Sequence, residues 1–212
     1  MATVITVAQQ KGGAGKTTLA ANIAAALASE RRVALLDIDP QKSLTRWHEL
    51  RKARNGQAAP ISFSEVSGWR LRNELDKLKR EHEILVIDSP PQIDTDAKLA
   101  VRGADLVLVP VQPSPPDIWA AEGTLKLAAD EGREAKLVLN RAPSTSRLRE
   151  AVEADMAARK LPALKSALGN RTGFASAFAE GLGVTEAAPR SAAASELRSL
   201  VEEISRISGR SS

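Results

Sequence analysis

The sequence contains no cysteine and no tyrosine, and aromatic residues make up only 3% of its 212 residues. The absence of cysteine excludes disulfides, iron–sulfur clusters and cysteine zinc sites, and it fits a reducing cytoplasm. The absence of tyrosine excludes tyrosine chemistry. Apolar residues nevertheless reach 43%, and alanine dominates them, so we expect a sizeable core in which helices pack closely on a sheet.

Long hydrophobic runs are also missing. No apolar stretch approaches the ~20 residues that span a bilayer, and the apolar residues before the first glycines are too few for the core of a signal peptide. The net charge of +4 is modest and the charges are mixed along most of the chain, so binding to a polyanion needs a local cluster of basic residues. We expect one domain over residues 1–208, with 209–212 as a frayed tail.

Short apolar runs alternate with helical patterns along the chain. Runs without polar alternation predict strands that are buried on both faces, and apolar residues three and four apart predict helices. We therefore expect an α/β fold with a mostly parallel central sheet covered by helices on both faces. The expected strands are 3–8, 32–39, 61–66, 84–88, 104–111 and 135–140, with a candidate last strand within 161–169. The expected helices are 16–30, 46–54 (exposed), 69–82, 96–103, 117–132, 145–160, 173–181 and 191–207.

A glycine-rich loop, "QQKGGAGKTT" at residues 9–18, follows the first expected strand. Glycine lets backbone N–H groups turn toward a single anion, and a helix N-terminus directly after the loop adds to the attraction. This pattern predicts a P-loop that cradles phosphates, formed by Gly12, Gly13, Ala14 and Gly15.

Side chains of the same loop complete the expected nucleotide site. We expect Lys16 to reach the β- and γ-phosphates, Thr17 to bind Mg²⁺ through its hydroxyl, and Thr18 to donate to the α-phosphate. Two features depart from the usual phosphate loop. Gln10 occupies the place of the first glycine, and Lys11 has no phosphate of its own, so a solvated loop lysine is one interpretation of it.

Carboxylates end two further strands. Asp88 closes an apolar run and suits the acid that holds Mg²⁺ through water, although a helix or turn cap is the alternative. Asp37 and Asp39 lie in "DIDP", where Pro40 keeps the preceding residue out of a helix, and such an acid could position the attacking water. The alternative for both is a pair of solvated loop acids. Because the carboxyl ends of parallel strands meet at one edge, all these groups should converge on one ligand.

The segments K-G-G-A-G-K-T-T, D-I-D-P-Q and I-L-V-I-D-S-P-P together resemble the ParA/MinD family of deviant Walker ATPases. That family has a lysine where Lys11 stands and lacks the first glycine, as at Gln10. The later segments "VLVPVQPSPPDIWAAEG" and "VLNRA" resemble the short ParA-type partition ATPases, and the similarity extends over nearly the whole chain.

The resemblance implies an ATP- and Mg²⁺-dependent homodimer. Lys11 would cross to the nucleotide of the other subunit, and Gly12 would allow close approach there. Asp39 would orient the hydrolytic water, while Asp37 would assist Mg²⁺ or the water. A second cation helps most at charge that develops on the transferred phosphoryl group, so its supply in trans couples hydrolysis to dimerisation. The residues implied to flank adenine are Asn140, Pro110, Pro113 and Pro115.

The C-terminal part of partition ATPases binds DNA without sequence preference. No acid occurs here between Met156 and Ala179, and several basic residues lie in and around this stretch. The candidate DNA-binding residues are Lys165, Arg171, Arg190 and Arg198. An ordinary solvated face is the alternative. Trp47 and Trp119, outside this region, are interpreted as core or partner-facing residues.

The function implied is a cytoplasmic, nucleoid-associated ATPase that positions a plasmid, a chromosome region or a protein assembly. A cargo-bound ParB-like adaptor would stimulate its weak basal hydrolysis. One alternative is a MinD-like membrane-cycling ATPase, but the last helix has a conventional core stripe with acids in its middle, so we expect no membrane partner. The other is a metabolic synthetase of the dethiobiotin synthetase type, which would not need Lys11 in trans.

Overall fold

The computed structural model describes residues 2–54, 56, 58–92, 94–143 and 146–209. Six strands form one sheet in the order β3-β2-β4-β1-β5-β6, and every neighbouring pair is parallel. The strands are β1 (Thr3–Val7), β2 (Val33–Asp37), β3 (Ser62–Glu65), β4 (Ile84–Asp88), β5 (Leu106–Val111) and β6 (Glu134–Leu139). The predicted α/β fold with a parallel central sheet is therefore confirmed.

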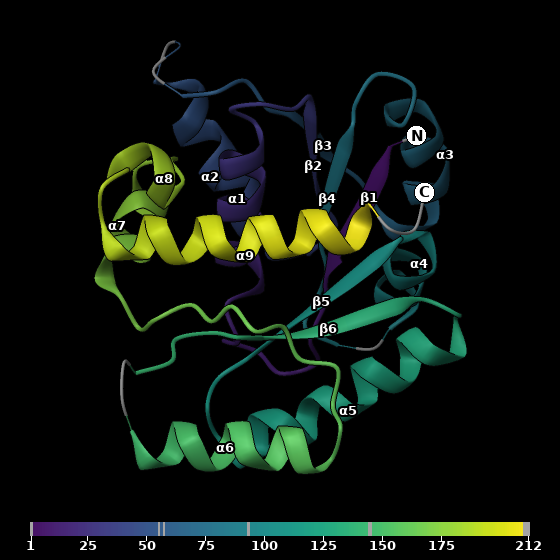
Figure 1. The fold of residues 1–212 in the computed structure, drawn as a ribbon. Helices are drawn as coiled ribbons and strands as arrows, with labels where there is room; N and C mark the ends of the chain where they lie inside the picture. Colours follow the sequence, from purple (N-terminus) through teal and green to yellow (C-terminus); the bar gives the residue numbers. More distant parts are fainter. Residues whose placement is uncertain (1, 55, 57, 93, 144–145, 210–212) are drawn as a thin grey trace.

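Helices cover both faces of this sheet (Figure 1). They are α1 (Lys16–Leu27), α2 (Ser43–Lys52), α3 (Gly68–Leu78), α4 (Thr95–Gly103), α5 (Pro115–Asp130), α6 (Arg147–Ala158), α7 (Thr172–Ala179), α8 (Val184–Ala187) and α9 (Ala192–Ser208). The short helix α8 has no counterpart among the predicted elements.

The core divides into layers on the two sides of the sheet. Ile5 and Val7 of β1 and Leu35 of β2 pack in one cluster with α1, α2 and the C-terminal helices α7–α9. Val4 and Leu36, their neighbours in sequence, point the other way and pack with α3 and α4. Successive residues of a strand face opposite sides, and both sides are covered here, which explains strands without polar alternation.

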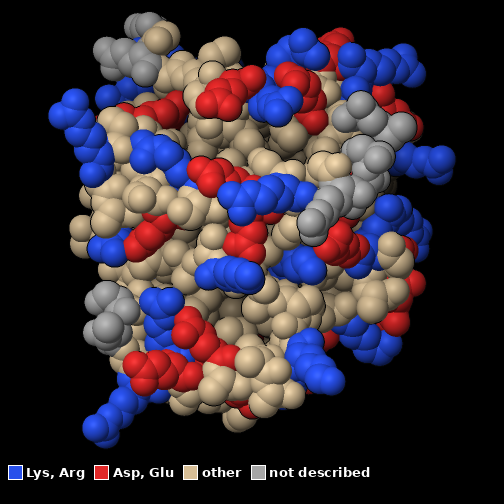
Figure 2. Space-filling model, viewed as in Figure 1, with Lys and Arg blue, Asp and Glu red and all other residues tan. Residues whose placement is uncertain are grey.

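The surface carries charges of both signs. Figure 2 shows basic and acidic side chains interspersed over the face that α9 crosses in Figure 1. Within the described part of the chain, no helix combines the length and the apolar character that a membrane span requires.

The predicted last strand within 161–169 is wrong. Residues of this segment form isolated parallel bridges, Leu137 with Ala163 and Ala142 with Gly169, and Leu168 N also donates to the Leu139 carbonyl, but they form no continuous strand. Proline has no N–H to donate to a ladder, and Pro162 contributes only its carbonyl, to Leu137 N. The segment therefore runs beside β6 as a loop.

The prediction of an exposed helix over 46–54 is also corrected. Helix α2 buries Leu44, Trp47 and Arg51. The Trp47 ring lies 6.3 Å from the ring of Phe178 in α7, and its Nε1 donates to the Leu182 carbonyl. Trp47 is thus a core residue, and the many charges of α2 had hidden its buried face.

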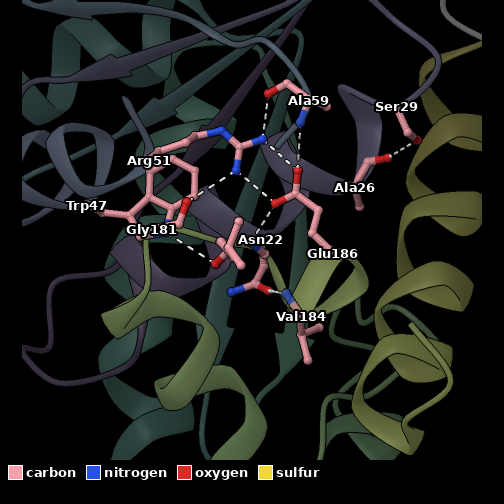
Figure 3. A network of polar contacts seen from close by, with 11 residues as sticks. Asn22, Ala26, Ser29, Trp47, Arg51, Ala59, Gly181, Val184 and Glu186 are labelled. Carbon is pink, nitrogen blue, oxygen red and sulfur yellow. Dashed lines mark hydrogen bonds and ion pairs between the residues drawn. The ribbon is translucent and has the colours of Figure 1, made fainter. Parts of the chain in front are cut away.

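A buried ion pair joins α2 to α8. The Arg51 guanidinium donates to Glu186 Oε1 at 2.6 Å and to Oε2 at 2.8 Å (Figure 3). Two backbone carbonyls accept from the same guanidinium, those of Ala59 and Gly181. From α1, Asn22 Oδ1 accepts from the backbone N–H of Val184. These bonds tie the helix after the "DIDP" turn to the C-terminal helices.

Candidate nucleotide-binding site

The carboxyl ends of β1, β2 and β4 lie side by side. Asp88 at the end of β4 is in register with Asp37 of β2 and with Val7 of β1. The glycine loop therefore emerges next to both carboxylates, as expected for ligand binding at this edge of a parallel sheet.

The glycine loop has a conformation that other residues rarely adopt. Gly13 has a φ of 77° and Gly15 a φ of 91°, and α1 begins at Lys16. The Asn140 amide donates to the Ala14 carbonyl at 2.9 Å, and a Cβ added at Gly15 would lie only 2.5 Å from the Asn140 Nδ2. The loop is thus held from the end of β6, and Asn140 supports its shape.

Two adjoining cavities border the loop. The first, of about 270 Å³, is lined by Gly12, Gly13 and residues 15–18 of the loop, and by Asp39. The second, of about 260 Å³, is lined by Gly15, Asn140 and the segment 168–172, and it shares Thr18 and Arg141 with the first. The pair has the arrangement that a phosphate chain and an attached base require.

The three prolines implied to flank adenine do not line either cavity. Pro110 lies within β5, and Pro115 begins α5. Asn140 lines the second cavity, together with Phe174, and its role beside adenine stays a prediction. The second cavity is lined instead by residues between 168 and 175, because the segment after β6 pairs with Ala142 at Gly169 and lies beside α1.

Asp88 is fully buried, and neither of its carboxylate oxygens has a hydrogen-bond partner among the described residues. Burial raises the pKa of Asp88 to about 8, the nearby Thr17 hydroxyl and Lys16 oppose this shift, and the charges of Asp37 and Asp39 add to it. An unpaired buried carboxylate is unfavourable in the chain alone. The site therefore fits a cation, and Thr17 with Asp88 would hold Mg²⁺, whose preferred ligands are hard oxygens.

Asp37 already has partners within the chain. It accepts from Asp39 N at 3.0 Å, and from both the N–H and the hydroxyl of Thr45 at 2.8 Å. Burial raises the pKa of Asp37, and the bonds from Thr45 oppose that shift. Asp37 thus fixes the turn between β2 and α2, which leaves Asp39 partly exposed at the first cavity.

The two lysines of the loop have different surroundings. Lys16 lies in the first cavity, where burial lowers its pKa and Asp88 and Asp39 oppose that shift. The Lys11 ammonium lies 2.5 Å from Asp117 Oδ2 in the first turn of α5, and 41% of the Lys11 side chain is exposed.

Two contacts of the deviant loop with α5 were missed by sequence reasoning. The Gln10 amide lies where a Cβ on Gly123 would be. Asp117 accepts not only from Lys11 but also from Ser114 Oγ at 2.6 Å. An isolated glycine in a helix rich in helix formers is a signal for such close packing, and it could have revealed the Gln10 contact.

The four candidate DNA-binding residues are exposed, but acids from α9 contact two of them, Lys165 and Arg171. Arg171 Nη2 lies 2.6 Å from Glu196 Oε1, and the backbone N–H of Lys165 donates to Glu203. The stretch without acids in the sequence therefore lies close to acids in space. The Arg198 guanidinium donates to the Pro189 carbonyl, and the side chain of Arg190 is exposed.

Comparison with known proteins identifies a nucleotide-binding domain. The family model described as the CobQ/CobB/MinD/ParA nucleotide binding domain matches residues 5–184. Maintenance of carboxysome distribution protein A of Halothiobacillus neapolitanus is 30% identical over 208 residues, which cover 94% of this chain and 95% of that protein. The protein of the same name from Gloeobacter kilaueensis is 34% identical over 209 residues, covering 96% and 94%.

Solved structures share the fold. The ATP complex of a substituted Cyanothece McdA has a TM-score of 0.79 at 19% identity and covers 96% of both chains. The cell division ATPase MinD of Pyrococcus furiosus has a TM-score of 0.82 at 22% identity, covering 98% of this chain and 100% of that one. On the evidence of the family model and the full-length relatives, the chain belongs to the CobQ/CobB/MinD/ParA nucleotide-binding family and is a ParA/MinD-type ATPase.

Proposed function

We propose that this chain is a positioning ATPase that binds ATP with Mg²⁺, dimerises face to face in that state, and associates with nonspecific DNA of the nucleoid. The observation that carries the proposal is the separation of the two loop lysines. Lys16 lines the cradle and can bind the phosphates, whereas the Lys11 side chain lies outside the cradle and pairs with Asp117 of α5. A loop lysine outside its own cradle suits a role at the nucleotide of a second copy.

The residues divide the work of hydrolysis as follows. The N–H groups of the loop and Lys16 hold the phosphates, and Thr17 with Asp88 holds Mg²⁺. Bound Mg²⁺–ATP supplies the phosphoryl group, with the metal offsetting its negative charge. Asp39 orients a water molecule toward that group. Lys11 of the second copy stabilises the charge that develops, as an arginine finger does.

The cargo is proposed to be a protein assembly of the carboxysome kind, engaged through an adaptor protein. Support comes from the two relatives named for carboxysome distribution, which match over nearly their full length. The chromosome partitioning protein ParA of Myxococcus xanthus is 33% identical, but over only 58% of this chain. A plasmid or chromosome region is therefore the less favoured cargo.

DNA binding is proposed to involve Lys165, Arg171, Arg190 and Arg198. Contacts with phosphates need positive charge but no base recognition. Because Glu196 and Glu203 offset part of that charge, we expect weak binding that is lost at moderate salt.

The test compares the wild type with Lys11→Ala and Asp39→Ala. Dimer mass, ATP turnover and retention on DNA are measured with and without ATP. We expect Lys11→Ala to lose the dimer and DNA retention, and Asp39→Ala to dimerise and hold DNA without turnover. If the wild type with ATP is not retained on DNA even at low salt, the proposed DNA binding is wrong. Retention on anionic vesicles instead would favour the MinD-like alternative.

A further inference from the structure

A groove beside Asp39 has no role in the cycle described above. Its volume is about 770 Å³, and it lies between the ends of β2 and β3, one face of α3 and the first turn of α4. Asp39 lines both this groove and the phosphate cradle, so one residue forms a shared wall. A ligand in the groove would therefore contact the turn that carries the proposed water-orienting residue.

An exposed indole marks the groove. Trp69, in the first turn of α3, is 70% exposed, more than any other large hydrophobic side chain in the described ranges. The Arg70 guanidinium lies over its ring, 4.4 Å from the ring centroid. Stacking restricts the indole in the free chain, which lowers the entropy lost on binding. Exposed tryptophans of this kind are enriched among residues that dominate protein interfaces.

The groove has a charge opposite to that of the chain. Five acids and three bases line it, a net charge of −2, whereas the whole chain is +4. The acids are Asp37, Asp39, Glu65, Glu74 and Asp96, and the bases are Lys42, Arg70 and Lys77. Negative potential repels nucleic acid and attracts basic polypeptide, so charge complementarity identifies the class of ligand.

We propose that this groove is the docking surface for a positively charged segment of another protein, which stacks on Trp69. The inference rests on the proposed function, since that segment would belong to the adaptor. Lys42, in the turn that follows Asp39, lies 2.5 Å from Glu65 Oε1 in β3. An incoming cation competes with Lys42 for Glu65. Loss of the Lys42–Glu65 ion pair would release the turn that carries Asp39 from β3. Docking would thereby change the position of Asp39, the proposed water-orienting residue.

The test measures binding of a fluorescein-labelled peptide of arginine, glycine and serine by fluorescence anisotropy, with no nucleotide present. A peptide with glutamate in place of arginine is the control ligand. We expect the arginine peptide to bind the wild type and the glutamate peptide not to bind. Trp69→Ala should weaken binding about tenfold, as for a hot-spot aromatic. Trp119→Ala, which removes an indole that is 62% exposed on α5, should leave binding unchanged.

A second pair of variants tests the charge. Asn73→Lys adds one positive charge inside the groove. Asp76→Asn removes one negative charge on the same helix outside the groove lining, so both variants raise the net charge by one. Both positions are exposed, so both variants should fold. We expect only Asn73→Lys to weaken binding severalfold. Equal binding by all variants, or no binding by the wild type, would overturn the docking surface. Because no nucleotide is used, that result is independent of whether the chain dimerises or hydrolyses ATP.

Discussion

Lys11 and Asp117 form an ion pair between the phosphate loop and the first turn of α5, with 2.5 Å between Nζ and Oδ2. The Asp117 side chain is buried and Ser114 Oγ also donates to it, whereas Lys11 is partly exposed. In a single copy, therefore, the lysine proposed to act in trans is held by its own chain. It must leave Asp117 before it can reach another nucleotide.

Asp117→Asn should release Lys11. We expect the ATP-dependent dimer to form at a severalfold lower chain concentration, because the competing intramolecular pair is gone. Analytical ultracentrifugation at several concentrations measures this. Ser114→Ala is the control, since it removes one donor to Asp117 but keeps the ion pair. An unchanged dimer constant in Asp117→Asn would mean that the pair does not restrain Lys11.

The same pair has a pH signature. Burial alone would raise the pKa of Asp117, but the bonds from Lys11 and Ser114 outweigh it and lower the pKa overall. A depressed carboxyl pKa adds stability that is complete above the unfolded value of 3.8 and is lost as pH falls through the folded value. Asp117→Asn should thus cost about 1 kcal/mol of unfolding free energy at pH 7 and less in acid, as measured by urea unfolding.

Gly12 and Gly15 differ in what a methyl group would meet. At Gly15 the φ of 91° and the contact with Asn140 oppose any side chain, so Gly15→Ala should destabilise the chain and abolish nucleotide binding. Nothing lies within 4 Å of a Cβ at Gly12, where φ is not positive. Gly12→Ala should fold and bind ATP normally, yet fail to dimerise. Calorimetric ATP titration and dimer mass separate the two outcomes, and loss of ATP binding in Gly12→Ala would contradict the role assigned to it.

The sequence predicts the sheet and its loops well because the pattern there is local. Strand β4 ends at Asp88 as expected, since its apolar run is bounded by charged residues on one side and prolines on the other. The pattern fails where a residue's environment comes from distant parts of the chain. The charged sequence around Arg51 predicts an exposed side chain. In the structure Arg51 is buried and pairs with Glu186, which is 135 residues away. No local signal reveals such a partner.

The candidate site divides in the same way. The loop and the acids converge as predicted, because parallel strands bring their carboxyl ends together. The acid-free basic stretch was judged only by its neighbours in sequence. Glu196 lies 25 residues from Arg171 and reaches it only through the packing of α9. Tertiary contacts of this kind are beyond a reading of composition and spacing.

Asp88→Asn should stabilise the nucleotide-free chain. Because burial raises the pKa of Asp88 to about 8, the folded state keeps a proton that the unfolded state releases near 3.8. The free energy of unfolding of the wild type therefore falls as pH rises between these values. Asparagine does not titrate, so the variant should not show this decrease. We expect a gain of about 1–3 kcal/mol at pH 8 and little at pH 4. The variant should also lose binding of Mg²⁺–ATP. Thermal unfolding measures this loss, because Mg²⁺–ATP should raise the Tm of the wild type and not that of the variant.

Glu196→Gln should strengthen DNA binding if Arg171 contacts phosphates. The change removes the carboxylate that lies 2.6 Å from the Arg171 guanidinium. A glutamine oxygen can still accept from the backbone N–H of Gly169, as Glu196 does now, so the local fold should persist. One more available cation steepens the dependence of log affinity on log salt by up to about 0.9.

Glu202→Gln is the matched control for that variant. Glu202 lies on the same helix and is exposed, but its partner is Arg206, 3.3 Å away, rather than Arg171. Both variants raise the net charge equally, so a general electrostatic effect would change both alike. A steeper salt slope in Glu196→Gln alone, measured by DNA retention at several salt concentrations, assigns the contact to Arg171. Equal slopes in the two variants would instead remove Arg171 from the proposed DNA surface.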